Sequence, residues 1–248
     1  MSQTPNSLLP YARCFMALYE RRPSPAALRG CIASWRALKG KTLEEAARGS
    51  QAWYEAGVRF WFLDALTTQS SGKGLETSKA EFMNGMEQTL SEGITGGWEA
   101  GVKEVGIEPD EISDEEYAAC GEFIAEQVAY LPPVWEWIGT QVGNETARQS
   151  VLSRAEVWFN LWNAAATKGK LMAGQDVKMR WTRGPTEKSC PDCLKLDGKV
   201  FRARTWQKYD IMPQSDRLSC SGFRCLCSLV PTDERVTPGK PPALVGPK

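Results

Sequence analysis

Five of the eight cysteines in this chain lie between residues 190 and 227. Cys190 and Cys193 have the C-x-x-C spacing of a zinc knuckle, and Cys220, Cys225 and Cys227 follow after a spacer from Leu194 to Ser219. The chain contains no histidine, so thiolates are the expected metal ligands throughout. The pattern predicts one Zn²⁺ held by four of these five cysteines. A site with four thiolates has no open coordination position, which indicates a structural metal rather than a catalytic one.

Five thiols for four places leave one spare, and two other uses of the cysteines remain open. Cys190 and Cys193 are expected ligands in every case. Cys225 and Cys227 would share a face of a regular strand, whereas Cys220 lies further back and could be the thiol left out. Two disulfides would need an oxidising compartment. A redox-active C-x-x-C would need a surrounding thioredoxin-like βαβ pattern, which the sequence does not have.

The residues needed for common catalytic mechanisms are missing. Without histidine, neither a Ser/His/Asp nor a Cys/His arrangement can form. Paired carboxylates occur in a helical pattern, but nothing in the sequence places them in a pocket. We therefore expect a protein that is not an enzyme.

Charge is balanced over the whole chain and uneven along it. Lys+Arg and Asp+Glu each number 30. The segment from Trp181 to the C-terminus has 12 basic and 7 acidic residues, whereas Glu104 to Ala147 has 11 acidic residues and no Lys or Arg. The acidic stretch is either a solvated face or a docking surface for a basic partner.

Neither secretion nor membrane insertion is indicated. Met1-Ser-Gln-Thr-Pro5 has no basic or apolar region of a signal peptide. No apolar run approaches the length of a membrane span. We expect synthesis in the cytoplasm, where thiols are reduced, and no contact with a membrane.

Helical patterns precede the cysteine cluster. We expect a mainly α fold, with a multi-helix body over residues 1–176. Glycines at 93, 96, 97 and 101 predict a kink or a close helix crossing. The expected helices are Pro10–Arg22, Ser24 to about Leu38, one from the capping box at Thr42, one from the capping box at Ser78, one from the capping box at Ser113 to Pro132-Pro133, a short segment with Trp135 and Trp137, and one from Asn144 or Thr146 to near Gly174.

Strand signals appear only after Val177. They predict a small zinc-ribbon-like β module over residues 177–230, followed by a proline-rich extended tail at 231–248. Asp197-Gly198 predicts a type I′ hairpin turn between two of the strands. The expected strands are Lys178–Thr182, Leu194–Leu196, Lys199–Ala203 and Ser228–Val230.

The C-terminal quarter resembles the end of the head-morphogenesis, or minor head protein, family of tailed phages, typified by the Mu F protein. The resemblance is carried by Trp181, by the run from Cys190 through Leu196-Asp-Gly-Lys-Val200, by Pro213-Gln-Ser215, and by the segment from Leu218 to Leu229 that ends in Cys225-Leu-Cys227. Family members often have a histidine before the last two cysteines, and Cys220 stands near that place. The identity of the third ligand therefore stays open.

The resemblance implies a non-enzymatic virion component located in the head near the portal vertex. Such a protein would be assembled in the host cytoplasm and would act in head assembly, DNA packaging or DNA delivery. Its partners would be the portal or major capsid protein, with possible contact to packaged DNA. The alternative is a nucleic-acid-binding zinc-ribbon protein, favoured by the basic C-terminal quarter with Trp206 and Phe223 interleaved. A metal-dependent nuclease is the weakest hypothesis, since it would need an open coordination position on the zinc.

Overall fold

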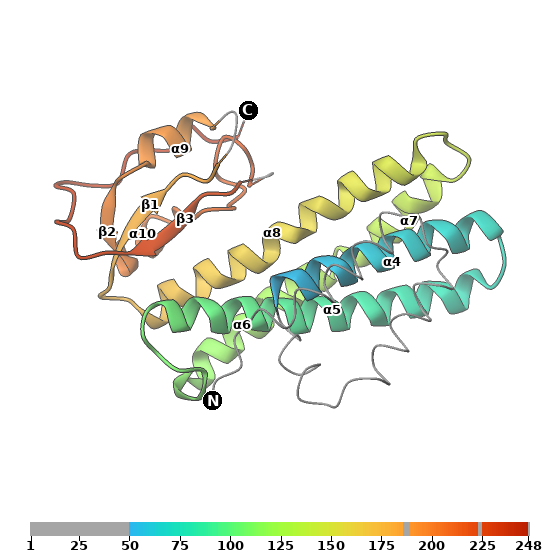
Figure 1. Cartoon of the computed structure of the whole chain (residues 1–248), viewed down its shortest axis with the longest axis horizontal. Coiled ribbons are helices and arrows are strands. Elements are labelled where there is room, and N and C mark those ends of the chain that lie inside the picture. The colour runs from blue at the N-terminus through green and yellow to red at the C-terminus, as the bar shows by residue number, and fades with distance from the viewer. Residues whose placement is uncertain (1–49, 186–188, 223–224, 248) are drawn as a thin grey trace, which may run out of the picture. The chain divides into compact units, whose positions relative to one another are not determined.

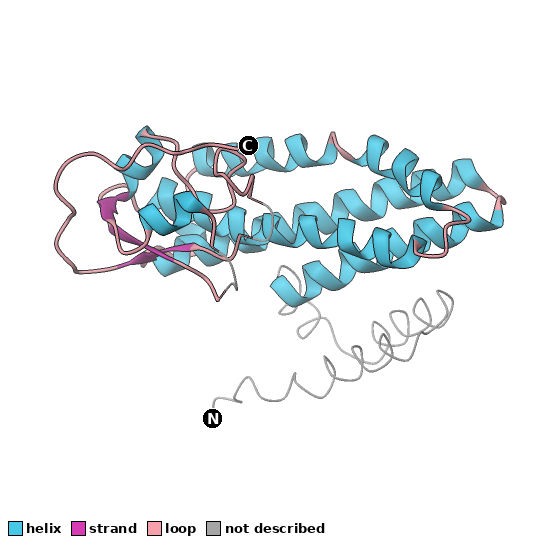
Figure 2. Ribbon diagram, turned by 90° about the horizontal axis from the view of Figure 1, so that it is seen from above, coloured by secondary structure: helices cyan, strands magenta, loops and turns pink. Residues whose placement is uncertain are grey.

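The computed structural model describes residues 50–185, 189–222 and 225–247. Within this part, the chain is mainly helical, with a small three-stranded antiparallel sheet toward the C-terminus (Figures 1 and 2). The predicted fold class, a helical body followed by a small β module, is confirmed. The helices expected between Pro10 and Leu38 and the capping box at Thr42 lie outside the described residues.

Three long helices form the centre of the body. They pack side by side around a core rich in aromatic residues (Figure 1). The hydroxyl of Tyr54 donates a hydrogen bond of 2.7 Å to the carbonyl of Trp158, which ties the first of these helices to the last. The body consists of α4 (Gln51–Ser71), α5 (Leu75–Glu104), the 3₁₀ turn η2 (Pro109–Glu111), α6 (Asp114–Val128), α7 (Leu131–Gln141) and α8 (Ala147–Ala173).

Glycines allow α5 and α8 to approach closely. A Cβ added at Gly101 would lie 1.9 Å from the carbonyl oxygen of Ala166, and one added at Gly97 would lie 2.5 Å from that of Trp162. A Cβ added at Gly169 of α8 would likewise lie 2.5 Å from the carbonyl oxygen of Trp98. The predicted close crossing is confirmed, and α5 continues as one helix through its glycines.

Two predicted helix boundaries are wrong, and a third is confirmed. Helix α5 begins at Leu75 rather than at Ser78, because Gly72 and Gly74 both adopt positive φ and close a short turn after α4. Pro132-Pro133 do not simply end a helix; they lie in the first turn of α7, where no intrahelical N–H is needed. The capping box of Ser113 and Glu116 is present and begins α6.

The β module contains three strands and two short helices. Strands β1 (Lys178–Thr182), β2 (Val200–Arg202) and β3 (Ser228–Pro231) are arranged in the order β2-β1-β3, with Trp181 opposite Leu229. Helix α9 spans Pro191–Leu196 and α10 spans Ala203–Lys208. Trp181, Phe201 and Trp206 are buried against one another and form most of the aromatic core of the module.

The strand expected at Leu194–Leu196 is instead the end of α9. Cys190 caps this helix and Pro191 occupies its first turn, so helix formation begins at the knuckle itself. The Asp197-Gly198 turn is also different from the prediction. Asp197 has φ −52° and ψ 130°, and only Gly198 has a positive φ, 72°. These angles are those of a type II turn, which joins α9 to β2 rather than two strands of a hairpin.

The tail after β3 is extended and packs on the module. The amide of Thr237 donates to the carbonyl of Val200 at 2.8 Å, and its hydroxyl accepts from the amide of Val200 at 3.0 Å. Pro241 is buried. The tail therefore forms neither helix nor central strand, as its prolines predict, and it covers the edge of β2.

A buried lysine connects the body to the module. Lys170 of α8 is 4% exposed, and its ammonium group donates to the Glu104 carboxylate and to the carbonyl of Leu229 in β3.

Among the described helices, none is long and apolar enough to cross a membrane.

A candidate metal centre of five thiols

The first two cysteines are positioned by the start of α9. Cys190 is the N-cap residue, and its sulfur accepts a hydrogen bond of 3.4 Å from the amide of Cys193. Pro191 between them fixes the backbone for the first helical turn. This local arrangement directs both sulfurs to the same side of the short helix, as the C-x-x-C spacing predicts.

All five predicted cysteines come together in space. They form two groups of three, Cys190/Cys193/Cys220 and Cys193/Cys225/Cys227, and within each group the sulfurs lie within 4.8 Å of one another. Cys193 belongs to both groups and is only 2% exposed. A tetrahedral ion with Zn–S bonds of about 2.3 Å separates its sulfurs by about 3.8 Å. The cysteines are therefore close enough to hold a metal ion with small side-chain movements.

The position of Cys193 at the junction of the two groups was not evident from the sequence. It results from the fold of the module, which brings Cys220, Cys225 and Cys227 to α9 from a distant loop. Cys225 and Cys227 are buried, whereas Cys190 and Cys220 are partly exposed. All five are free thiols in this structure.

The thiols influence one another strongly. Hydrogen bonds from Cys193 and Cys227 lower the pKa of the Cys225 thiol to about 2. Hydrogen bonds with Cys225 and Cys227, together with burial, raise the pKa of the Cys193 thiol. Burial and the nearby negative charge of Cys225 raise the pKa of Cys220 to about 12. Because thiols bind a metal in their deprotonated form, a bound cation would displace protons from the thiols of this cluster.

Gln214 holds the loop that carries the last two cysteines. Its side-chain amide donates to the carbonyls of Cys225 and Cys227, at 2.9 and 2.6 Å. Gln214 itself adopts a positive φ of 62°, and Gly222 packs so close to its backbone that an added Cβ would lie 2.2 Å from the Gln214 carbonyl oxygen. Sequence reasoning did not identify this role, although Gln214 is part of the Pro213-Gln-Ser215 run, because Gln214 is 11 residues or more from the carbonyls that it binds.

Asp192, between the two knuckle cysteines, is a buried carboxylate with specific partners. It is 0% exposed and accepts hydrogen bonds from the amide of Ser219 at 2.8 Å and from the amide of Val245 at 2.6 Å. Burial acts to raise the pKa of the Asp192 carboxyl, but these hydrogen bonds outweigh it and hold the pKa below its usual value. Asp192 thus joins α9 to the residue before Cys220 and to the C-terminal tail.

The donor set determines which metals the cluster would accept. Thiolates select soft or borderline ions such as Zn²⁺, Cu⁺ or iron in iron–sulfur clusters rather than Mg²⁺ or Ca²⁺.

Comparison of the chain with models of protein families, with characterised proteins and with solved structures found no match.

Proposed function

We propose that this chain is a structural minor head protein of a tailed phage, associated with the portal or major capsid protein. The observation that carries the proposal is the cysteine cluster of residues 190–227, whose sequence resembles the end of that family. A helical body and a compact thiol-rich module among the described residues support such a role, because both present surface for protein contacts.

We propose further that the cluster holds one structural Zn²⁺. Cys193 serves as a ligand in any four-thiol arrangement, since it is the residue that the two groups share. The module has a small core, and domains of this size usually need a metal or disulfides to be stable. Zinc binding supplies apparent free energies on the order of 10 kcal/mol in small zinc modules.

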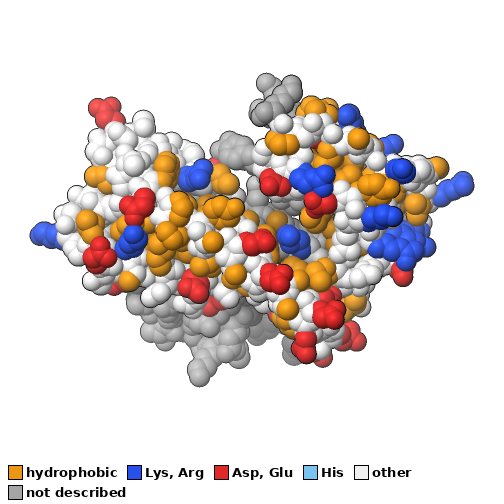
Figure 3. Space-filling view, turned by 180° about the vertical axis from the view of Figure 1, so that it is seen from behind, with side chains coloured by type: hydrophobic (Ala, Val, Ile, Leu, Met, Phe, Trp, Pro, Cys, Tyr) orange, Lys and Arg blue, Asp and Glu red, His pale blue; other side chains and the backbone are white. Residues whose placement is uncertain are grey.

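Nucleic-acid binding is the second candidate function, and the structure weakens one part of its support. Trp206 is 0% exposed and its indole N–H donates to the carbonyl of Met179 at 3.1 Å, so its ring is not available to stack on a base. Phe223 lies outside the described residues. The basic side chains remain, and Figure 3 shows Lys and Arg gathered where the C-terminal module lies. Contact with packaged DNA is therefore proposed only through phosphate contacts.

Co-purification tests the proposed function. The full chain carries an affinity tag and is expressed with the portal and major capsid proteins of the same genome. We expect the chain to co-purify with portal rings or with assembled heads, and to be detected in purified virions by mass spectrometry. Virions that lack the chain, combined with salt-dependent binding of DNA by the free protein, would favour the second candidate instead.

A further inference from the structure

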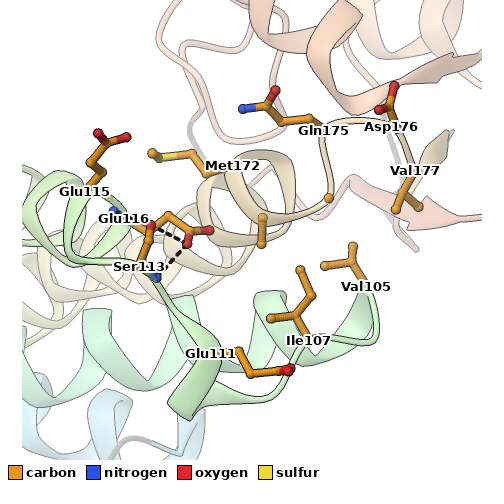
Figure 4. Close-up of a pocket in the computed structure, with 12 residues that line it drawn as sticks. Val105, Ile107, Glu111, Ser113, Glu115, Glu116, Met172, Gln175, Asp176 and Val177 are labelled. Carbon is orange, nitrogen blue, oxygen red and sulfur yellow. Dashed lines mark hydrogen bonds between the residues drawn. The ribbon is translucent and has the colours of Figure 1, made fainter.

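A hollow lies where the ends of α5 and α8 meet the start of α6 (Figure 4). Its volume is about 490 Å³. The lining comes from the end of α5, the η2 turn, the first turn of α6 and the connection from α8 to β1. The residues that form it are distant in sequence. The chain is tightly packed at Gly174, where an added Cβ would lie 2.9 Å from both the carbonyl oxygen of Lys170 and Cγ1 of Val105.

The floor of the hollow is apolar. Val105, Ile107, Met172 and Val177 line it, and all four are only partly buried. Figure 4 shows Val105 and Ile107 pointing toward the space between α6 and the α8–β1 connection. These side chains expose apolar surface that a ligand can cover.

The rim is acidic. Glu111, Glu115, Glu116 and Asp176 surround the floor. Asp176 already pairs with Arg204 at 2.8 Å. Among the described residues, no Lys or Arg forms an ion pair with any of the three glutamates, in agreement with the absence of basic residues from 105 to 147.

Glu116 has one carboxylate oxygen without a donor. Its Oε2 accepts from the amide of Ser113 at 2.9 Å and from the hydroxyl of Ser113 at 2.8 Å. Its Oε1 is buried and accepts no hydrogen bond within the described structure. The carboxylate of Glu116 therefore has Ser113 as its hydrogen-bond partner and no positively charged one among the described residues.

We propose that this hollow is a docking site for a basic segment of a partner protein, in which an arginine side chain occupies the hollow. The aliphatic stem of arginine covers apolar surface while its guanidinium reaches polar groups. The guanidinium presents five donors, which matches a rim of several carboxylates. A small cation would leave the apolar floor uncovered, and nucleic acid would be repelled by the rim. The inference does not depend on the function proposed above.

A binding measurement with a defined probe tests this assignment. The probe is a fluorescent nine-residue peptide with three arginines and two leucines, and its counterpart carries glutamine in place of arginine. The full chain is titrated against both by fluorescence anisotropy at physiological salt. We expect the arginine peptide to bind and the glutamine peptide to bind at least about tenfold more weakly, because the rim selects positive charge.

Charge-matched variants locate the site. The triple variant Glu111→Gln, Glu115→Gln, Glu116→Gln removes three rim charges, and glutamine keeps the capping bonds of the first and last of these positions. The control is Glu122→Gln, Glu126→Gln, Glu145→Gln, which removes three exposed charges outside the lining.

We expect the rim variant to weaken binding of the arginine peptide by about tenfold or more, and the control by less than about threefold. Ile107→Thr tests the floor and should weaken binding of the same peptide with the rim intact. Circular dichroism confirms that each variant is folded. Equal losses in the rim and control triples, or equal binding of the two peptides, would overturn the proposal. Binding of a DNA duplex that the rim variant abolishes would overturn it as well.

Discussion

Gly101→Ala is expected to destabilise the helical body. The Cβ of the new alanine would lie 1.9 Å from the carbonyl oxygen of Ala166 and 2.6 Å from its carbonyl carbon. Both atoms belong to the backbone of α8, so no side-chain rotation can relieve the clash. The two helices must move apart along a contact that the glycines of α5 make possible.

The magnitude follows from two opposing effects. Overpacking of a tight contact costs about 1–3 kcal/mol, and a backbone clash belongs at the upper end of that range. Replacing glycine by alanine within a helix contributes about 1 kcal/mol of stability. The net loss is therefore about 2 kcal/mol. For a protein of this size, 1 kcal/mol corresponds to about 2–4 °C in Tm, so Tm should fall by about 4–8 °C.

Gly121→Ala is the matched control. Gly121 is an exposed residue within α6, and no neighbouring atom lies within 4 Å of an added Cβ. This substitution carries the same gain in helix propensity without the clash, and should raise Tm by about 2–4 °C. Thermal melting of the full chain followed by circular dichroism at 222 nm measures both. If Gly101→Ala melts at or above the wild-type temperature, the close packing of α5 against α8 described above is incorrect.

Four further substitutions test the module. Asp192→Asn removes a charged acceptor from two hydrogen bonds and should destabilise the module by about 1.5–3 kcal/mol at neutral pH. Because the folded-state pKa of Asp192 is lowered, the stability advantage of the wild type over this variant is complete above about pH 4 and declines as the pH falls through the folded pKa. Urea unfolding of both proteins at pH 7 and pH 3 measures this difference. Cys193→Ser should abolish metal binding because Cys193 belongs to both thiol groups. Cys220→Ser, in contrast, should leave zinc stoichiometry near one if Cys220 is the spare thiol. Metal analysis that shows equal losses of zinc in the two variants would contradict this difference. Lys170→Met should increase hydrogen exchange in β3, since the carbonyl of Leu229 loses its bond to the ammonium group, and unchanged exchange would show that Lys170 does not stabilise the junction.

Local signals in the sequence predicted the structure well where the cause was itself local. The capping box at Ser113 specifies the start of α6 through residues that are close in sequence. The glycines of α5 allow the close approach to α8 because they have no side chain. Strand β1 has the predicted bounds, Lys178–Thr182. The strand expected at Leu194–Leu196 failed because hydrophobic alternation over three residues is weak, and the cap at Cys190 outweighed it.

Features that depend on distant contacts could not be predicted. The spacing of the cysteines identified all five members of the cluster, but only the fold shows that Cys193 lies between the two groups of three. The sequence likewise gives no sign that Asp192 binds the amide of Val245, 53 residues away. The choice between a core position and a base-stacking position for Trp206 likewise depends on the fold, since a tryptophan between basic residues is compatible with both until its packing is known.

Metal analysis of the full chain tests the central claim most directly. The protein is purified under reducing, anaerobic conditions, its metal content is measured by mass spectrometry, and its thiols are titrated before and after chelation. We predict one zinc per chain, with the thiols of the 190–227 cluster protected until the chelator is added. A chain that carries no metal and whose cluster thiols are lost as disulfides would contradict the account.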